Sequence, residues 1–318
     1  MADILEKLVQ LPKAHLHAHM DGCCGRALWD ATFPGDDPVF QGGDLAQFLD
    51  HYFSVQNKIR ERLNNLDIIQ SVYEEAVQHH VYHLELSVGV RNMGGAAEQF
   101  VEQAQSLAAQ MGLSVSFLFM TQRDYPEADI RHILSEAKRL AKLGYPVSGL
   151  ACAGPQTPGG LGKLEKILQE EGRDSLAIVP HAGELSDPPS DIWDALRLRP
   201  RRIAHGNQAI HDPELVERLR RDGICLDMAP SSNIILGVTQ AAHPFPELVR
   251  AGVPCSISAD DSLIFGITLS DEYLRLYNMG MTLHELAHCA RASFVHSTAT
   301  SEVKERGLLD VDRWEKSL

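Results

Sequence analysis

Long apolar runs, positive charge and paired cysteines are all scarce in this 318-residue sequence. No uninterrupted apolar stretch approaches the ~18 residues of a membrane-spanning helix. The opening MADILEKLVQLPK lacks the basic and then apolar segments of a signal peptide. The 29 Lys and Arg face 43 Asp and Glu, a formal charge of −14, whereas nucleic-acid binding depends largely on basic residues. These absences argue against membrane and nucleic-acid partners and predict a cytoplasmic protein.

The six cysteines include no C-x-x-C pair and lie mostly inside apolar runs. This usage is typical of reduced thiols in a cytosolic enzyme rather than of a disulfide framework. Cys23 and Cys24 follow the first apolar run, where they could be reactive or could simply fill a loop. With 44% hydrophobic residues the chain can bury a sizeable core. No linker divides it, so we expect one domain over residues 1–318.

Eight short apolar runs alternate with amphipathic helical patterns along the chain. The predicted strands cover about 13–19, 80–88, 114–121, 147–153, 176–182, 201–205, 224–230 and 255–261. Helices are predicted over 2–10, 95–111, 126–143, 191–198, 212–222, 245–251, 269–278, 282–297 and around 301–307. An insertion of roughly 60 residues follows the first strand, longer than an ordinary crossover, and it is helical over 45–80.

This alternation is typical of a parallel sheet, and eight units indicate a (β/α)8 TIM barrel with a helical insertion after the first strand. A doubly wound open sheet is the alternative. That fold normally has a Gly-rich phosphate turn after its first strand. Asp21-Gly22-Cys23-Cys24-Gly25 does not match G-x-G-x-x-G, which favours the barrel.

The first predicted strand contains His15-Leu16-His17-Ala18-His19. Alternate side chains of a strand point to the same face, so the three histidines are predicted to share one. Two imidazoles two residues apart can bind one divalent ion, and zinc favours nitrogen ligands. Because His15 lies one layer deeper than the other two, we expect it to have a structural, hydrogen-bonded role.

Three later apolar runs also end in polar groups: His181-Ala-Gly-Glu184, Ile203-Ala-His205 and Ser258-Ala-Asp260-Asp261. In a barrel the reactive groups gather at the carboxyl ends of the strands. A single buried histidine at a strand end is more often a hydrogen-bonded core residue than a metal ligand. Four such strand ends are harder to explain by packing, because buried imidazoles and carboxylates are costly unless they are paired or bind metal. The pattern therefore predicts a metal site.

The ordered segments L11-P-K-A-H-L-H-A-H-M-D-G22, H181-A-G-E184, R202-I-A-H-G206, P230-S-S-N233 and S258-A-D-D-S-L-I-F265 resemble the motifs of the adenosine deaminase family of the amidohydrolase superfamily. The resemblance extends from residue 11 to about residue 300. It implies a zinc-dependent hydrolytic deaminase that acts on a 6-aminopurine. One Zn²⁺ per chain is implied, because strand four lacks the lysine that binuclear relatives carboxylate.

The resemblance also assigns roles to residues of this chain. The implied zinc ligands are His17, His19, His181 and Asp260. The implied catalytic residues are Glu184 as proton donor to the purine, and His205 and Asp260 as the groups that orient the attacking water and handle its proton. The implied substrate contacts are Asp261 and the Gly154 backbone for the purine, and Asp21 for the ribose.

Departures from the family pattern concern the pocket wall. His15 stands where the family usually has Glu, Ser87 stands where Arg is common, and acidic positions around Gly154 are replaced in residues 151–156. Asp21 accompanies ribosyl substrates in the family, and free adenine would leave its carboxylate unpaired. We therefore expect a small-molecule purine nucleoside: adenosine or a 5′-modified adenosine such as methylthioadenosine or aminodeoxyfutalosine.

Alternatives remain open from the sequence. One is an adenine deaminase, and another is a zinc hydrolase of a different N-heterocycle, an ester or an amide. The pair Glu184 and Asp261 fits an aromatic N-heterocycle better than a scissile carbonyl. A non-catalytic binding protein on the same barrel is disfavoured because every expected ligand and acid–base position is filled. The oligomeric state stays open.

Overall fold

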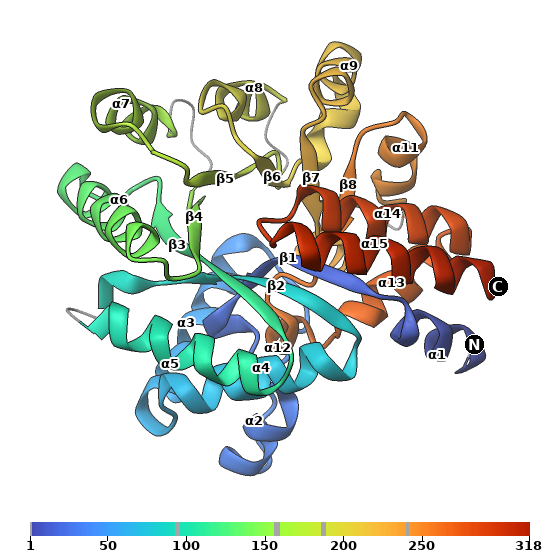
Figure 1. Ribbon diagram of the computed structural model, residues 1–318, viewed down its shortest axis with the longest axis horizontal. Helices are drawn as coiled ribbons and strands as arrows, with labels where there is room; N and C mark the ends of the chain where they lie inside the picture. The colour runs from blue at the N-terminus through green and yellow to red at the C-terminus, as the bar shows by residue number, and fades with distance from the viewer. Residues whose placement is uncertain (1, 93–95, 156–159, 186–188, 240–241) are drawn as a thin grey trace.

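The computed structural model describes residues 2–92, 96–155, 160–185, 189–239 and 242–318. Eight parallel strands follow one another in chain order around a barrel, with helices outside them (Figure 1). The strands are β1 (Lys13–His19), β2 (Val81–Val88), β3 (Ser114–Gln122), β4 (Val147–Ala153), β5 (Ala177–Ala182), β6 (Arg202–His205), β7 (Cys225–Met228) and β8 (Cys255–Ile257). An isolated bridge between Ala18 and Asp260 joins the two ends of the sheet. The predicted (β/α)8 barrel is confirmed.

The α-helices alternate with the strands and continue past β8. They are α1 (Ala2–Gln10), α2 (Arg26–Thr32), α3 (Leu45–Arg62), α4 (Asn65–Gln78), α5 (Ala97–Gln110), α6 (Glu127–Lys142), α7 (Gly162–Glu171), α8 (Ser190–Arg197), α9 (Pro213–Asp222), α10 (Pro230–Ile235), α11 (Phe245–Arg250), α12 (Ser262–Phe265), α13 (Leu269–Asn278), α14 (Leu283–His296) and α15 (Ser301–Lys316). Short 3-10 turns include η1 (Met20–Gly22), η2 (Val90–Asn92) and η4 (Asn207–His211). Within the described ranges, no helix is both long enough and apolar enough to span a membrane.

Three sequence expectations need correction. Strand β8 ends at Ile257 rather than near 261, because the chain turns at Asp260, whose φ is 61°. Helix α7 lies between β4 and β5, where no helix was expected; it follows a Gly-rich segment and buries only Leu164 and Ile167. Helix α15 continues to Lys316, well past the expected end near 307.

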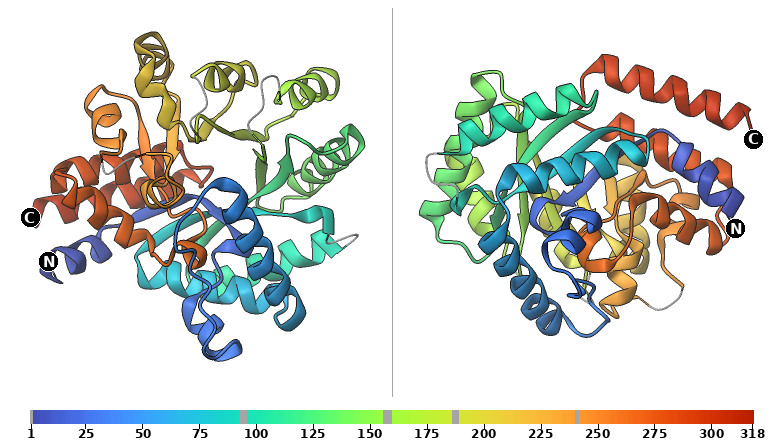
Figure 2. Two further views of the ribbon diagram at one scale, coloured as in Figure 1. Left: turned by 180° about the vertical axis from the view of Figure 1, so that it is seen from behind. Right: turned by 90° about the horizontal axis from the view of Figure 1, so that it is seen from below.

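The insertion after β1 contains separate helices rather than one periodic stretch. The Asp44 side chain caps α3 by accepting from the backbone N–H of Gln47, and Asn64 caps α4 in the same way. Because Ser, Thr, Asp and Asn caps favour helix starts, these two residues mark where each helix begins. Seen from behind, the insertion lies across the barrel (Figure 2, left). Helix α3 lies there beside the carboxyl ends of the strands.

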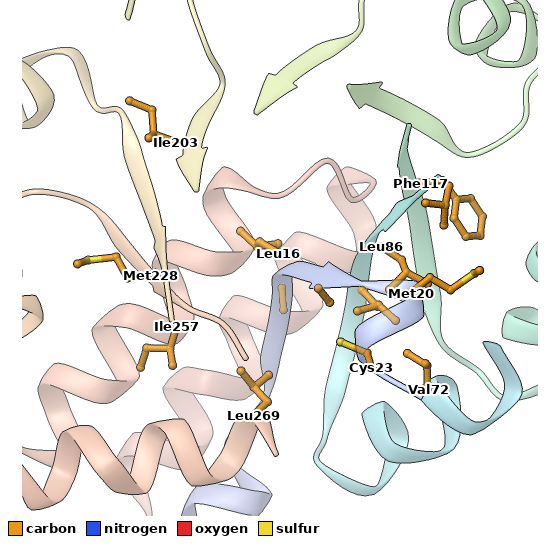
Figure 3. Packing of buried hydrophobic residues seen from close by; sticks show 14 of the residues in the cluster. Leu16, Met20, Cys23, Val72, Leu86, Phe117, Ile203, Met228, Ile257 and Leu269 are labelled. Atoms are coloured by element: carbon orange, nitrogen blue, oxygen red, sulfur yellow. The ribbon is translucent and has the colours of Figure 1, made fainter. Parts of the chain in front are cut away.

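Apolar side chains fill the space inside the barrel and the larger space between strands and helices. Leu118, Ala151, Val179 and Ala204, from four consecutive strands, form a small cluster apart from the main core. The main core includes Cys23, which Figure 3 shows beside Val72 of α4. This packing holds the strand ends in fixed positions, which in turn fixes the positions of the polar side chains at those ends.

Gly307 allows α15 to pack closely on α14, and its replacement tests this contact. A Cβ at Gly307 would lie 2.3 Å from Cε1 of the buried Phe294 ring. We expect Gly307→Ala to lower the free energy of unfolding by up to about 2 kcal/mol, because overpacking costs roughly 1–3 kcal/mol and the helix-propensity gain offsets only ~1 kcal/mol. Gly162→Ala, with no atom within 4 Å of the new Cβ, is the matched control. Denaturant unfolding that shows both variants equally stable would contradict this packing argument.

Candidate active site

The carboxyl ends of β1 and β8 bring three potential metal ligands to one point. The Nε2 atoms of His17 and His19 are 3.2 Å apart. Oδ1 of Asp260 lies 3.3 Å from the first and 3.2 Å from the second. Two ligands that bind one tetrahedral zinc ion at 2.0–2.1 Å are about 3.3 Å from each other. The spacing of these three atoms therefore fits one shared ion.

His181 and His205, from the ends of β5 and β6, face the same point. The ring centroids of His181 and His205 lie 4.7 Å and 4.8 Å from that of His17. Donor atoms of His17, His19 and His181 all lie within 4.8 Å of one another. The φ angles of His205 and Asp260 are 67° and 61°, left-handed values that cost a non-glycine residue roughly 1–3 kcal/mol. Both strained residues carry side chains of this cluster.

The charges of Asp260, His181 and His205 suit metal binding. Burial would lower the pKa of His17, but the Asp260 and Asp227 carboxylates outweigh burial and raise it. Burial would raise the pKa of Asp260, but His17 and His19 hold it well below its usual value, so this residue is a carboxylate. Burial and the neighbouring His17 lower the pKa of His181 far below its usual value. They also lower the pKa of His205, to about 3. Neutral imidazoles and an ionised carboxylate are the forms that bind metals.

Glu184 lies beside His205, on the turn after β5. Its Oε2 is 3.5 Å from Nε2 of His205, and its side chain is 17% exposed. The buried Arg123 fixes this turn by donating to the His181 carbonyl at 2.5 Å and pairing with Asp191 at 2.7 Å. Asp191 in turn accepts from the backbone N–H of residue 183 at 3.1 Å. Glu184 is thus a partly solvated acid on a braced turn.

Asp261 is buried next to Asp260, with one oxygen directed to no protein donor. Burial and the Asp260 carboxylate raise the pKa of Asp261 well above its usual value. Its Oδ1 has no hydrogen-bond partner within the described part of the chain. A Cβ at Gly22 would lie 1.7 Å from that oxygen, so only glycine leaves room for this carboxyl group. Asp261 is therefore placed to exchange a hydrogen bond with a ligand.

Asp21 lies at the mouth of β1, where α3 already supplies partners for it. Gln56 Nε2 donates to its Oδ2 at 3.1 Å, and Arg60 lies 3.6 Å from the same oxygen. Burial raises the pKa of Asp21, although Arg60 opposes this shift. The expectation that Asp21 would be unpaired without a ribose is therefore wrong.

These groups border a cavity of about 470 Å³ at the carboxyl ends of the strands. Asp21, Gly154 and Asp261, the expected substrate contacts, line it, together with Glu184 and Ser87. Gln156 lies outside the described residues. The opposite wall is a stripe of α3 side chains at helical spacing: Leu45, Phe48, Leu49, Tyr52 and Phe53. A cavity of this size and mixed lining is typical of small-molecule sites.

His15 and the two neighbouring cysteines lie outside the ligand cluster. The β1–β2 register shifts between His15 and Ala18, so strict alternation fails there. His15 lines a separate small cavity beside α4, and its Nε2 accepts from the Ala259 N–H at 3.0 Å. The expected hydrogen-bonded role of His15 is confirmed. The expectation that His15 shares a strand face with His17 and His19 is not. Cys23 and Cys24 are buried, and burial raises the pKa of both thiols, so neither is a reactive thiolate.

A buried charge network below the cluster was missed in the sequence. Arg202 pairs with Glu85 and with Asp227, each at 2.6 Å, and all three side chains are fully buried. The Asp227 backbone carbonyl lies 3.3 Å from Nδ1 of His17, which leaves Nε2 of His17 for the site. The available signal was the presence of charged residues inside β-rich apolar runs, where an unpaired charge is costly.

An eight-stranded barrel with histidines and carboxylates at four strand ends is the arrangement of a barrel enzyme whose site could hold a metal ion. The family model described as adenosine deaminase matches residues 36–314. The chain belongs to the adenosine deaminase family, whose members are hydrolytic deaminases and are typically metal-dependent.

Relatives within the family differ in substrate. An adenine deaminase of Rhizobium etli is 30% identical over 83% of this chain and 87% of its own length. An aminodeoxyfutalosine deaminase of Streptomyces coelicolor is 29% identical over 95% and 85%. The crystal structure of an adenine deaminase from Arthrobacter aurescens superposes with a TM-score of 0.82 and 26% identity, covering 96% of this chain and 99% of that one. The Arabidopsis ADAL structure with IMP, at 20% identity and a TM-score of 0.81, shows the shared fold.

Removing Arg202 tests the buried network. We expect Arg202→Met to lower the free energy of unfolding by about 3–5 kcal/mol, because Glu85 and Asp227 would be left as uncompensated buried charges. Arg218→Met, at a partly exposed surface pair, is the control and should cost about 1 kcal/mol or less. Equal stability of the two variants in denaturant unfolding would show that the network is dispensable.

The same network predicts a direction of pH dependence. Burial alone would raise the pKa of Glu85, but Arg202, His83 and the Thr298 N–H outweigh it and lower the pKa to about 2. A carboxyl group with a depressed folded-state pKa stabilises fully above its ordinary value of 4.5. That stabilisation declines as the pH falls from about 4.5 towards 2.

Proposed function

We propose that this chain is a zinc-dependent hydrolytic deaminase of a 6-aminopurine nucleoside, with residues 1–318 acting as one catalytic unit. The observation that carries the proposal is the convergence of Asp260 Oδ1 with the Nε2 atoms of His17 and His19. This point borders the cavity that also contains Glu184 and Asp261. The negative formal charge of the chain supports a small-molecule substrate rather than a nucleic acid.

One Zn²⁺ would be held by His17, His19, His181 and Asp260. Bound there, it would supply Lewis-acid activation of a water molecule at neutral pH. Strand β4 contains no lysine, which supports a mononuclear site. Nδ1 of His205 is buried without a hydrogen-bond partner among the described residues, which leaves this imidazole to orient the attacking water and accept its proton.

Glu184 and Asp261 would act on the purine ring. Glu184, protonated, delivers a proton to N1, which makes C6 more electrophilic. Water adds at C6 as His205 accepts its proton, and that proton then passes to the N6 amino group. The C6–N6 bond breaks, ammonia leaves, and the remaining C6 hydroxyl returns a proton to Glu184 as the carbonyl forms. Asp261 holds the ring by a hydrogen bond. Its Oδ1, which has no hydrogen-bond partner among the described residues, is the atom available to the ring. The N–H or carbonyl of Gly154, which also lines the cavity, provides a further contact.

The nucleoside assignment rests on the part of the cavity beyond the reacting ring. Asp21, Gln56 and Arg60 form a polar group at the carboxyl half of α3. The apolar stripe that begins at Leu45 lies along the rest of that helix. A ribose hydroxyl can bind Asp21 while a larger 5′ substituent contacts the stripe. This arrangement suits adenosine or a 5′-modified adenosine, including aminodeoxyfutalosine, the substrate named for one relative.

Adenine deamination is the second candidate, and one observation favours it. Gln56 and Arg60 already contact the Asp21 carboxylate. Asp21 would therefore keep these protein partners when free adenine is bound. Two of the relatives are named adenine deaminases. The two candidates share the chemistry at C6 and differ only in the N9 substituent.

Glu184→Gln separates proton delivery from metal binding. We expect this variant to keep its metal and to lose about 10²–10⁴ in kcat, the usual contribution of general acid catalysis. Glu217→Gln, at the exposed face of α9, is the control. The readouts are ammonia release and metal content. Near-normal turnover by the metal-loaded Glu184→Gln enzyme would remove Glu184 from the mechanism.

Asp21→Ala tests the ribose assignment. We expect kcat/KM for nucleosides to fall at least about tenfold, because a hydrogen bond to a charged group contributes roughly 1.5–3 kcal/mol. Free adenine should be little affected, and wild type should prefer the nucleosides. Asp124→Ala, an exposed acid on the same cavity, should leave the ranking of substrates unchanged. Wild-type preference for adenine would favour the second candidate.

A further inference from the structure

A second hollow lies at the opposite end of the barrel from the proposed active site. It has a volume of about 500 Å³ and is bordered by the residues that begin β4, β5 and β6. Residues 297–299, which connect α14 to α15, form another side. Figure 1 views the molecule from the side on which α14 and α15 lie, and Figure 2 (left) shows the insertion on the other side.

Three arginines from two separate loops line this hollow: Arg173, Arg199 and Arg201. Many arginines elsewhere pair with carboxylates, as Arg131 does with Glu170 at 2.5 Å. For these three, the described ranges of the chain provide no such pair. In a chain of formal charge −14, a cluster of unpaired guanidinium groups is unexpected unless it meets an anion.

Backbone contacts fix two of the guanidinium groups without neutralising them. Arg173 donates from Nη1 to the carbonyl of Arg199 at 2.7 Å. Arg201 donates from Nη2 to the carbonyl of Ser297 at 2.6 Å. A guanidinium has five N–H donors, so each retains donors for a ligand. No protein acceptor is recorded for the side chain of Arg199 in the described ranges.

The other charges near the hollow do not cancel this cluster. Asp174, the acidic residue on the wall, pairs with Lys142 at 3.2 Å. The buried Arg202 lies next in sequence to Arg201 and is itself neutralised by two carboxylates. Burial and the positive charge of Arg202 lower the pKa of Arg201. An anion in the hollow would relieve that unfavourable charge.

We propose that this hollow is a binding site for a phosphate group, either inorganic phosphate or the phosphate of a nucleotide. Arg173, Arg199 and Arg201 would bind its oxygens through charge-assisted hydrogen bonds, for which the planar guanidinium is well suited. The hydroxyl group of Ser175 on the same wall is a further donor. The site is independent of the proposed deaminase chemistry, since it lies at the other end of the barrel.

The test is binding of inorganic phosphate, measured by calorimetry and by the shift in melting temperature, against chloride at equal ionic strength. We expect wild type to bind phosphate saturably and Arg199→Ala to bind at least about tenfold more weakly, because one charge-assisted hydrogen bond is lost. Arg199→Ala/Arg201→Gln should abolish saturation. Arg220→Ala/Arg221→Ala, on the surface of α9, removes the same charge elsewhere and should bind like wild type.

A parallel titration with uridine 5′-monophosphate, which offers no 6-aminopurine, distinguishes the two sources. Tighter binding than phosphate, lost in the same variants, assigns the hollow to nucleotides; equal binding assigns it to phosphate alone. No stabilisation beyond that of chloride, or wild-type affinity in the double variant, would overturn the proposal. Unchanged far-UV circular dichroism of each variant shows that loss of binding is not loss of folding.

Discussion

Asp260 closes the barrel and also brings the residues of the proposed active site together. Its backbone N–H donates to the carbonyl of His17, and its carbonyl accepts from the N–H of His19, both at 3.2 Å. These are the bonds around the bridge that joins β1 to the segment after β8. Its side chain lies between the same two histidines. The left-handed backbone of Asp260 is tolerated because the surrounding strands leave it no alternative.

Further contacts around Asp260 position the other residues of the proposed site. Below it, Arg202 and its two carboxylates hold Asp227, whose carbonyl orients His17. To one side, Arg123 braces the turn that carries Glu184. To the other, Asp261 follows Asp260 directly and occupies the space that Gly22 leaves open. Preorganised charges in a desolvated pocket are worth far more than in water, so these contacts support the proposed chemistry.

The sequence predicted the barrel and the gathered side chains because both follow from local patterns. Apolar runs mark strands, and polar residues at their carboxyl ends must meet in a parallel barrel. Contacts between distant segments leave no such pattern. The break in alternation at His15, the partners that α3 supplies to Asp21, and the cluster of Arg173 with Arg199 and Arg201 depend on tertiary packing. Helix α7 was missed because glycines precede it and few of its residues are buried.

Metal content tests most directly whether one ion is bound by His17, His19, His181 and Asp260. The protein is stripped with a chelator, reloaded with zinc, passed through a desalting column and analysed by plasma mass spectrometry. The account predicts one zinc per chain in wild type and in His284→Ala, whose histidine is exposed, and none in His17→Ala. Two tightly bound ions per chain, or full zinc retention by His17→Ala, would contradict it.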